Sequence, residues 1–147
     1  MELEIRSISL DEAIAIRHQF LKPHLPPDET LSPGDLDPEG VHLGAFLEGT
    51  FVGAMSAGPE QCPLLEVVRG SWRLRGFAVY PQHRAKGIGT RLLEEIIASA
   101  SASSRNLLWG TPRLRIVDLY RRFGFETIGE PFEIEPSGLH QTVVRRF

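Results

Sequence analysis

Residues 77–93 read FAVYPQHRAKGIGTRLL, and this stretch predicts three structural elements in a fixed order. Phe77-Ala78-Val79 is continuously apolar, which is typical of a central strand buried on both faces. Pro81 ends that strand. The sequence Arg84-Ala85-Lys86-Gly87-Ile88-Gly89 predicts a tight turn, and the residues from Thr90 to Ala98 have the periodicity of an amphipathic helix. We therefore expect a strand, a Gly-rich turn and a helix.

The predicted turn is suited to binding an anion. The first N–H groups of a helix have no intrahelical partner, and they point outward at the positive end of the helix dipole. Glycine is expected at 87 and 89 because a β-carbon would obstruct an approaching oxyanion or forbid the required φ. Arg84 and Lys86 add positive charge. A purely structural turn remains an alternative, because a bare G-x-G before a helix is a weak signal.

The charges of the chain are unevenly distributed. Residues 1–66 hold twelve Asp or Glu against three Lys or Arg, whereas residues 69–91 hold six Lys or Arg and no acidic residue. A basic segment beside a Gly-rich turn favours a phosphate-bearing ligand. A nucleic-acid partner is less favoured, because the basic segment is short and the whole chain has a net charge of −3. A solvated basic face is the third interpretation.

The first half of the chain predicts strands around one helix. Residues 3–8 alternate apolar and polar residues as a half-buried strand does. Asp11 is expected to cap a helix from Glu12 to about Leu21. The Pro-, Asp- and Gly-rich residues 22–40 predict a loop with at most a short turn. Strands at 41–47 and 51–57, joined by Glu48-Gly49-Thr50, predict a hairpin.

The second half continues with strands and helices in alternation. The central strand is expected from Ser71 to Tyr80, and Gly76 within it indicates a bulge or a close approach of another group. Residues 106–109 predict another strand. A helix is expected over 113–123, with Pro112 at its start and Gly124 as its stop signal, before a strand from about residue 125.

Length and composition indicate one globular domain over residues 1–147. The absence of a long apolar run or a signal-like amino terminus predicts a cytoplasmic protein with no membrane partner. Cys62 is the only cysteine, which excludes an intramolecular disulfide and a cysteine cluster. His18, His24, His42 and His83 are not spaced like metal ligands, so we predict no metal site.

Two motifs resemble those of the GNAT family of N-acetyltransferases. The order Phe77-Ala78-Val79-Tyr80-Pro81, Arg84, Gly87-x-Gly89 is similar to its motif A. Tyr120, Gly124 and Phe125 resemble its Tyr-x-x-x-Gly-Phe signature. Together the two motifs cover about residues 74–128 in the expected order.

This resemblance implies an α/β fold, with a mixed, largely antiparallel, twisted sheet of six or seven strands and about three principal helices. It implies acetyl-coenzyme A as cosubstrate and a small-molecule or peptide amine as acceptor, with a homodimer as one expected assembly. The cofactor is expected where the strand ending at Tyr80 splays from the strand ending near Trp109. The implied cofactor-binding residues are Phe77, Ala78, Val79, Arg84, Ala85, Lys86, Gly87, Ile88, Gly89, Thr90 and Arg113.

The resemblance also suggests catalytic roles. Pantetheine is expected along the strand Phe77–Val79, where the N–H of Phe77 or Ala78 would polarise the thioester carbonyl. Tyr120 is the candidate acid that protonates the departing thiolate, although an isolated tyrosine at this spacing would be interpreted as a core residue. Glu66 and His140 are alternative candidate bases. A solvated carboxylate and a structural histidine are the simpler interpretations of these two.

The sequence departs from the family pattern at two positions. Arg113 stands where relatives often have a cofactor-contacting Asn, so that role cannot be transferred unchanged. Ala85 replaces a turn glycine, which is a mild change if its φ stays negative. The acidic residues 28–39 favour a cationic amine as acceptor. Two other functions remain open: a non-catalytic acyl-coenzyme A-binding module, and a phosphate- or nucleic-acid-binding domain.

Overall fold

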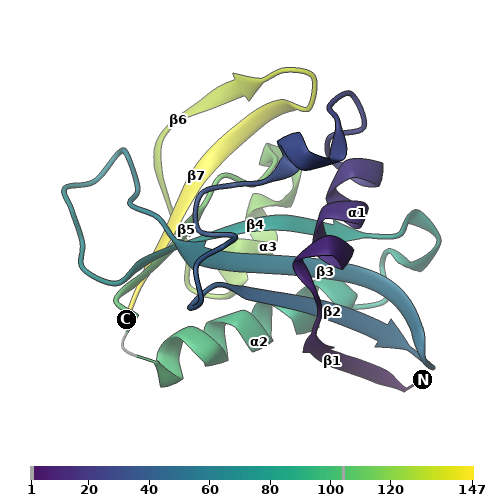
Figure 1. The fold of residues 1–147 in the computed structure, drawn as a ribbon. Helices are drawn as coiled ribbons and strands as arrows, with labels where there is room; N and C mark the ends of the chain where they lie inside the picture. Colours follow the sequence, from purple (N-terminus) through teal and green to yellow (C-terminus); the bar gives the residue numbers. More distant parts are fainter. Residues whose placement is uncertain (1, 104) are drawn as a thin grey trace.

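The computed structural model describes residues 2–103 and 105–147. In the described residues the chain forms a seven-stranded sheet with three α-helices and three short 3-10 helices (Figure 1). The strands are β1 (Leu3–Ser7), β2 (Val41–Leu47), β3 (Thr50–Pro59), β4 (Ser71–Val79), β5 (Leu107–Gly110), β6 (Glu126–Ile134) and β7 (Gly138–Arg146). The helices are α1 (Leu10–Phe20), α2 (Ile88–Ala102) and α3 (Val117–Arg122), with 3-10 turns η1 (Pro27–Thr30), η2 (Pro81–His83) and η3 (Leu114–Ile116).

The sheet has the order β1-β2-β3-β4-β5-β7-β6. Its neighbouring strands are antiparallel except β4 and β5, which are parallel and pair only over Ser71–Arg73 and Leu107–Trp109. Beyond this short contact β4 runs away from β5 and β7 (Figure 1). The predicted mixed, largely antiparallel sheet with three principal helices is confirmed.

Helices cover both faces of the sheet. Along β3, Ala54 packs with Ile16 of α1 on one face, whereas Met55 belongs to the main core with Leu93 of α2 on the other. The period of two along the strand produces this division. Four residues of α2, at the spacing of one helical face, are almost fully buried: Leu92, Leu93, Ile96 and Ile97.

The prediction that Asp11 caps the first helix was wrong. Ser9 is the N-cap residue: its Oγ accepts a hydrogen bond from Glu12 N, and the Glu12 carboxylate accepts one from Ser9 N, both at 3.1 Å. This reciprocal pair is a capping box. Asp11 instead lies in the first helical turn, where its charge favours the helix dipole.

The helix expected over 113–123 is shorter and begins later. Arg113 is extended, with φ −61° and ψ 141°, because its backbone bridges to His140 on β7. A 3-10 turn precedes α3, so Pro112 does not occupy a first helical position and that prediction was wrong. Gly124, with φ +85°, follows the helix as predicted.

Candidate active site

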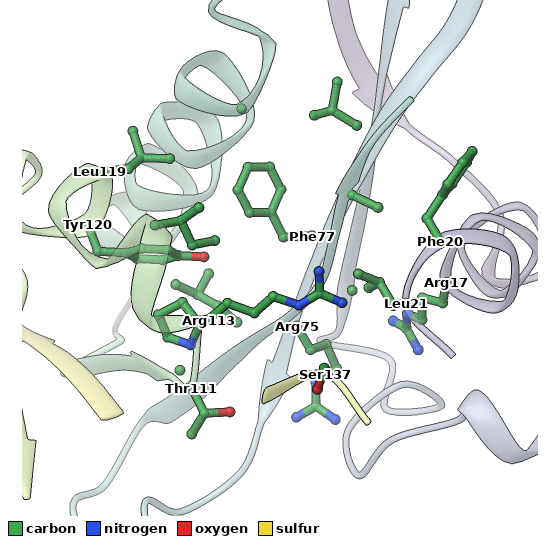
Figure 2. A pocket seen from close by; sticks show the side chains of 18 of the residues that line it. Arg17, Phe20, Leu21, Arg75, Phe77, Thr111, Arg113, Leu119, Tyr120 and Ser137 are labelled. Atoms are coloured by element: carbon green, nitrogen blue, oxygen red, sulfur yellow. The ribbon is translucent and has the colours of Figure 1, made fainter. Parts of the chain in front are cut away.

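A cavity of about 710 Å³ opens where β4 separates from β5. Its walls come from α1, β4, the turn before α2, η3 with α3, and the β6–β7 hairpin. In Figure 2 Arg113 and Tyr120 lie on one wall, and Arg17, Phe20 and Leu21 lie on the opposite wall. The lining includes every predicted cofactor-binding residue except Lys86: Phe77, Ala78, Val79, Arg84, Ala85, Gly87, Ile88, Gly89, Thr90 and Arg113.

The Gly-rich turn presents its backbone N–H groups at one end of this cavity. Gly87 is the N-cap of α2 in the left-handed region, with φ +77° and ψ +10°, and no side chain caps the helix. Among the described residues, no carbonyl or side chain accepts a hydrogen bond from the N–H groups of residues 85–90. An anion with several oxygens can accept these N–H groups together.

The two turn glycines are required for different reasons. A β-carbon at Gly87 would meet no atom within 4 Å, so its positive φ is the constraint. A β-carbon at Gly89 would stand 2.5 Å from Cζ of Phe77, so this glycine allows the strand and the turn to pack closely. Ala85 also has a positive φ, +63°, so the condition under which this replacement would be mild is not met. An L-residue is strained in this region.

Basic side chains surround the turn. Arg84 Nε donates to the Val79 carbonyl at 3.3 Å, which ties the turn to the end of β4. Burial lowers the pKa of Arg113, and the positive charges of Arg115 and Arg84 lower it further. Such clustered positive charge favours a ligand with more than one negative charge. Lys86 lies outside the cavity lining, and its Nζ is 3.4 Å from His83 Nδ1.

A β-bulge shapes the middle of β4. Arg75 pairs with Ser56 and Ala78 pairs with Ala54, so Gly76 and Phe77 together face Met55 of β3. Gly76 has φ +62°, which confirms the bulge indicated by its place in the strand. Past Arg73 the opposite edge of β4 has no partner strand among the described residues, and it borders the cavity. An extended, peptide-like ligand can add to such an edge.

Tyr120 lies on α3 and lines the cavity from within the core. Its residue surface is only 3% exposed, and its ring packs edge-on against Phe125 with centroids 5.4 Å apart. Burial raises the pKa of the Tyr120 phenol, so the hydroxyl keeps its proton at neutral pH. Figure 2 shows the hydroxyl directed toward the interior of the cavity.

His140 lies on β7 and is held at both ring nitrogens. Nδ1 is 2.7 Å from the Thr111 carbonyl, and Nε2 is 3.0 Å from Ser137 Oγ. Because a carbonyl only accepts, Nδ1 carries a proton, and neutral His140 then accepts the Ser137 hydroxyl proton at Nε2. The Ile134 carbonyl is 3.1 Å from the same hydroxyl. If His140 becomes protonated, Ser137 can therefore accept from Nε2 and donate to Ile134, so no hydrogen bond is lost.

The candidate base Glu66 is not near these groups. It lies on the exposed loop before β4 and is not part of the cavity lining. Sequence reasoning missed Arg17, Lys22, Arg75 and Ser137, which do line the cavity. Their approach depends on the packing of α1 against β4 and on the pairing of β7 with β5, which brings the β6–β7 hairpin to the cavity. Local sequence patterns do not reveal either arrangement.

The described residues contain no group of three or more His, Cys, Asp or Glu side chains arranged to hold a metal ion. No helix in this part of the chain combines the length and apolar character that crossing a membrane requires.

Comparison with known proteins places this geometry in a family. The model of the acetyltransferase (GNAT) family matches residues 7–125. An uncharacterized N-acetyltransferase of Bacillus subtilis, YitI, is 30% identical over 138 residues, covering 94% of this chain and 92% of that protein.

Solved structures share the fold. A GNAT-family acetyltransferase from Streptococcus pneumoniae aligns with a TM-score of 0.72 and 24% identity, over 99% of this chain and 100% of that one. The protein YncA from Salmonella typhimurium, solved with its cofactor acetyl-coenzyme A, aligns with a TM-score of 0.74 and 15% identity, over 99% and 94% of the two chains.

Proposed function

The chain belongs to the acetyltransferase (GNAT) family and is an N-acetyltransferase, and from this premise we propose that it transfers the acetyl group of acetyl-coenzyme A directly to a primary amine. Residues 1–147 would act as one catalytic domain. One observation carries the proposal: the unpaired N–H groups of residues 85–90, the open edge of β4 and the Tyr120 side chain all border one cavity.

The residues of the cavity fit coenzyme A chemically. The N–H groups of residues 85–90, with Arg84 and Arg113, would hold the diphosphate. The open edge of β4 offers backbone groups to the amides of pantetheine. Lys86 would act only as a nearby charge, because it lies outside the lining. When bound, acetyl-coenzyme A supplies an acetyl thioester that an amine can attack.

The bulged part of β4 would orient and polarise the reacting carbonyl. The N–H of Phe77 or Ala78 would donate to the carbonyl oxygen as negative charge develops there. The Gly76–Phe77 bulge supports this role because it interrupts the pairing with β3 and redirects the strand. The cavity walls would hold the amine beside this point, and that positioning is a large part of the catalysis.

Tyr120 and His140 would handle the protons. As the new C–N bond forms and the C–S bond breaks, Tyr120 Oη would donate its proton to the departing thiolate sulfur. The proton released from the amine nitrogen would pass to His140 Nε2 through Ser137 Oγ, which already lies 3.0 Å from that nitrogen. Glu66 has no part in this proposal, because it lies away from the cavity.

An amine-dependent assay tests the proposal. The protein is mixed with acetyl-coenzyme A and a panel of primary amines, and free coenzyme A thiol and acetylated amine are both measured. The proposal expects equal amounts of the two products. Tight cofactor binding without amine-dependent release would contradict it and favour a non-catalytic module. Salt-sensitive nucleic-acid binding that acetyl-coenzyme A does not displace would favour the phosphate-binding alternative.

A further inference from the structure

The part of the cavity between α1 and the β6–β7 hairpin is lined by positive charge. Four basic side chains line it: Arg17, Lys22, Arg73 and Arg75. Within the described residues, no Asp or Glu belongs to the lining of the whole cavity. The carboxylates of Asp35 and Glu60 pair with the arginines, but neither residue belongs to the lining. A ligand in this part of the cavity therefore meets cations first.

The buried charges do not balance. Arg17 and Asp35 form a double contact of 2.6 and 3.0 Å, with side chains 4% and 2% exposed. Arg73 and Arg75 share the single carboxylate of Glu60, at 3.0 and 2.5 Å. Two carboxylates thus pair with three buried or partly buried arginines, which leaves one of these positive charges uncompensated. The exposed Lys22 adds a second positive charge in contact with solvent.

Arg75 has more unused hydrogen-bonding capacity than Arg17 and Arg73, each of which leaves only Nε without a partner among the described residues. Arg73 also donates to Thr111 Oγ1 at 3.1 Å and stacks on Trp109. Arg75 Nη2 donates to Glu60, whereas its Nε and Nη1 are buried without a hydrogen-bond partner among the described residues. The Arg75 side chain is only 7% exposed, and it lines the cavity. Buried charged donors are strongly stabilised by a partner.

We propose that the amine acceptor carries a carboxylate close to its amino group, and that Arg75 binds this carboxylate with Lys22 at the cavity mouth. The inference rests on the proposed function, because it places the amine at the Gly76–Phe77 bulge. Arg75 directly precedes that bulge, and a strand rises about 3.3 Å per residue. A carboxylate bound by the Arg75 guanidinium would therefore lie about one side-chain length from the bulge, which suits a small amino-acid-like compound.

The charge count selects among anions. Of the two unbalanced cations only Arg75 is buried, whereas the charge of the exposed Lys22 is screened by solvent. A single buried cation matches a singly charged carboxylate better than a doubly charged phosphate. The sequence had instead favoured a cationic amine, on the basis of the acidic residues 28–39. None of those acidic residues lines the cavity, and Asp35 is already paired with Arg17. The structure therefore favours the opposite charge on the acceptor.

The test compares acceptors that differ in one group: amino acids, their amides, their decarboxylated amines, and phosphoethanolamine. Wild-type protein should turn over the amino acids with kcat/KM about 10- to 100-fold above the matched amides. R75Q should bring this ratio close to one, and K22Q should reduce it in part. The exposed Arg69 offers a control for loss of charge, and R69Q should keep the wild-type ratio. A preference for amides, amines or phosphoethanolamine would overturn the proposal.

A binding measurement separates this inference from the proposed function. N-acetyl amino acids and their amides are titrated calorimetrically into the complex with coenzyme A, for wild type, R75Q and K22Q. Carboxylate-dependent binding that R75Q abolishes, without amine turnover, would uphold the subsite and reject the transfer reaction. Turnover without carboxylate preference would do the reverse. K22Q changes an exposed side chain, so it remains informative if R75Q does not fold.

Discussion

The Phe77 ring lies against Gly89 so closely that a β-carbon at position 89 would stand 2.5 Å from its Cζ. The contact joins the bulged strand to the first turn of α2, and both residues line the cavity. The position of the Gly-rich turn relative to β4 thus depends on the absence of one side chain.

G89A should destabilise the protein and weaken cofactor binding. The added methyl group must displace the Phe77 ring or the helix start, and overpacking of this kind costs about 1–3 kcal/mol. Urea unfolding and calorimetry with coenzyme A measure the two effects. G110A is the control: a β-carbon at Gly110 meets its nearest atoms at 3.5 Å, so its free energy of unfolding should stay close to wild type. Equal effects of the two variants would contradict this packing argument.

The substitutions A85G and G87A should change the free energy of unfolding in opposite directions. Ala85 and Gly87 both have positive φ, +63° and +77°. A85G should raise the free energy of unfolding by about 0.5–1 kcal/mol, because it relieves left-handed strain that exceeds the entropy gained by the unfolded chain. G87A should lower the free energy of unfolding by about 1 kcal/mol, because an L-residue is strained at this φ. No steric clash adds to this cost, because no atom lies within 4 Å of the new β-carbon. Urea denaturation of both variants checks the signs, and a destabilised A85G would contradict the account.

Y120F should lower kcat by about 100-fold or more while leaving the affinity for coenzyme A unchanged. Burial raises the pKa of this phenol, so its neutral form persists above the ordinary value of about 10. Between pH 7 and 10 the phenol should therefore cause no alkaline loss of wild-type activity. A fall in wild-type kcat below pH 10 that Y120F abolishes would contradict the proposed protonation state.

D35N should lower the free energy of unfolding by about 3–5 kcal/mol, because it leaves the buried Arg17 without its carboxylate. Burial acts to raise the pKa of Asp35, but hydrogen bonds from Arg17 and Ser32 N outweigh it and hold the pKa below its usual value. Stability from this group is therefore present above the unfolded pKa of about 3.9, and it is lost as pH falls through the folded pKa.

Urea unfolding from pH 7 down to pH 2 measures this effect. D35N should be less stable at pH 7 and lose less of its remaining stability below pH 4 than wild type. D28N is the control, because the exposed Asp28 has no ion pair among the described residues. If the free energy of unfolding fell equally for wild type and D35N as the pH is lowered, Asp35 would not stabilise the fold through its charge.

The elements predicted correctly from the sequence are those that a few adjacent residues determine. The strand before Pro81, the turn at Gly87 and the apolar face of α2 each follow from adjacent residues. The first helix is capped by Ser9 instead of Asp11, because both residues favour the N-cap position and only Ser9 has a Glu three residues later that completes a capping box. The third helix begins later than predicted because Arg113 forms a β-bridge with His140, which is distant in sequence.

The sequence indicated the residues of the proposed cofactor side, but it did not single out those of the proposed acceptor side. A motif of adjacent residues indicated the turn, whereas Arg75 appeared only as one member of a basic segment. Its role in the cavity depends on its ion pair with Glu60, just after β3, and on the separation of β4 from β5. The spacing of residues along the sequence reveals neither this ion pair nor this separation of the strands. Glu66 was a candidate base because it precedes β4 in the sequence, but it does not line the cavity. Closeness in sequence to a strand of the site was therefore not enough to place it there.

Calorimetric titration of acetyl-coenzyme A into wild type, G87A and G87E tests most directly whether the turn binds the diphosphate. G87A and G87E share the backbone strain of a positive φ, but only G87E adds a bulky negative charge beside the N–H groups. We predict tight binding to wild type, moderately weaker binding to G87A, and a loss of at least about 100-fold in folded G87E. Wild-type affinity in G87E would contradict the assignment of the cofactor site.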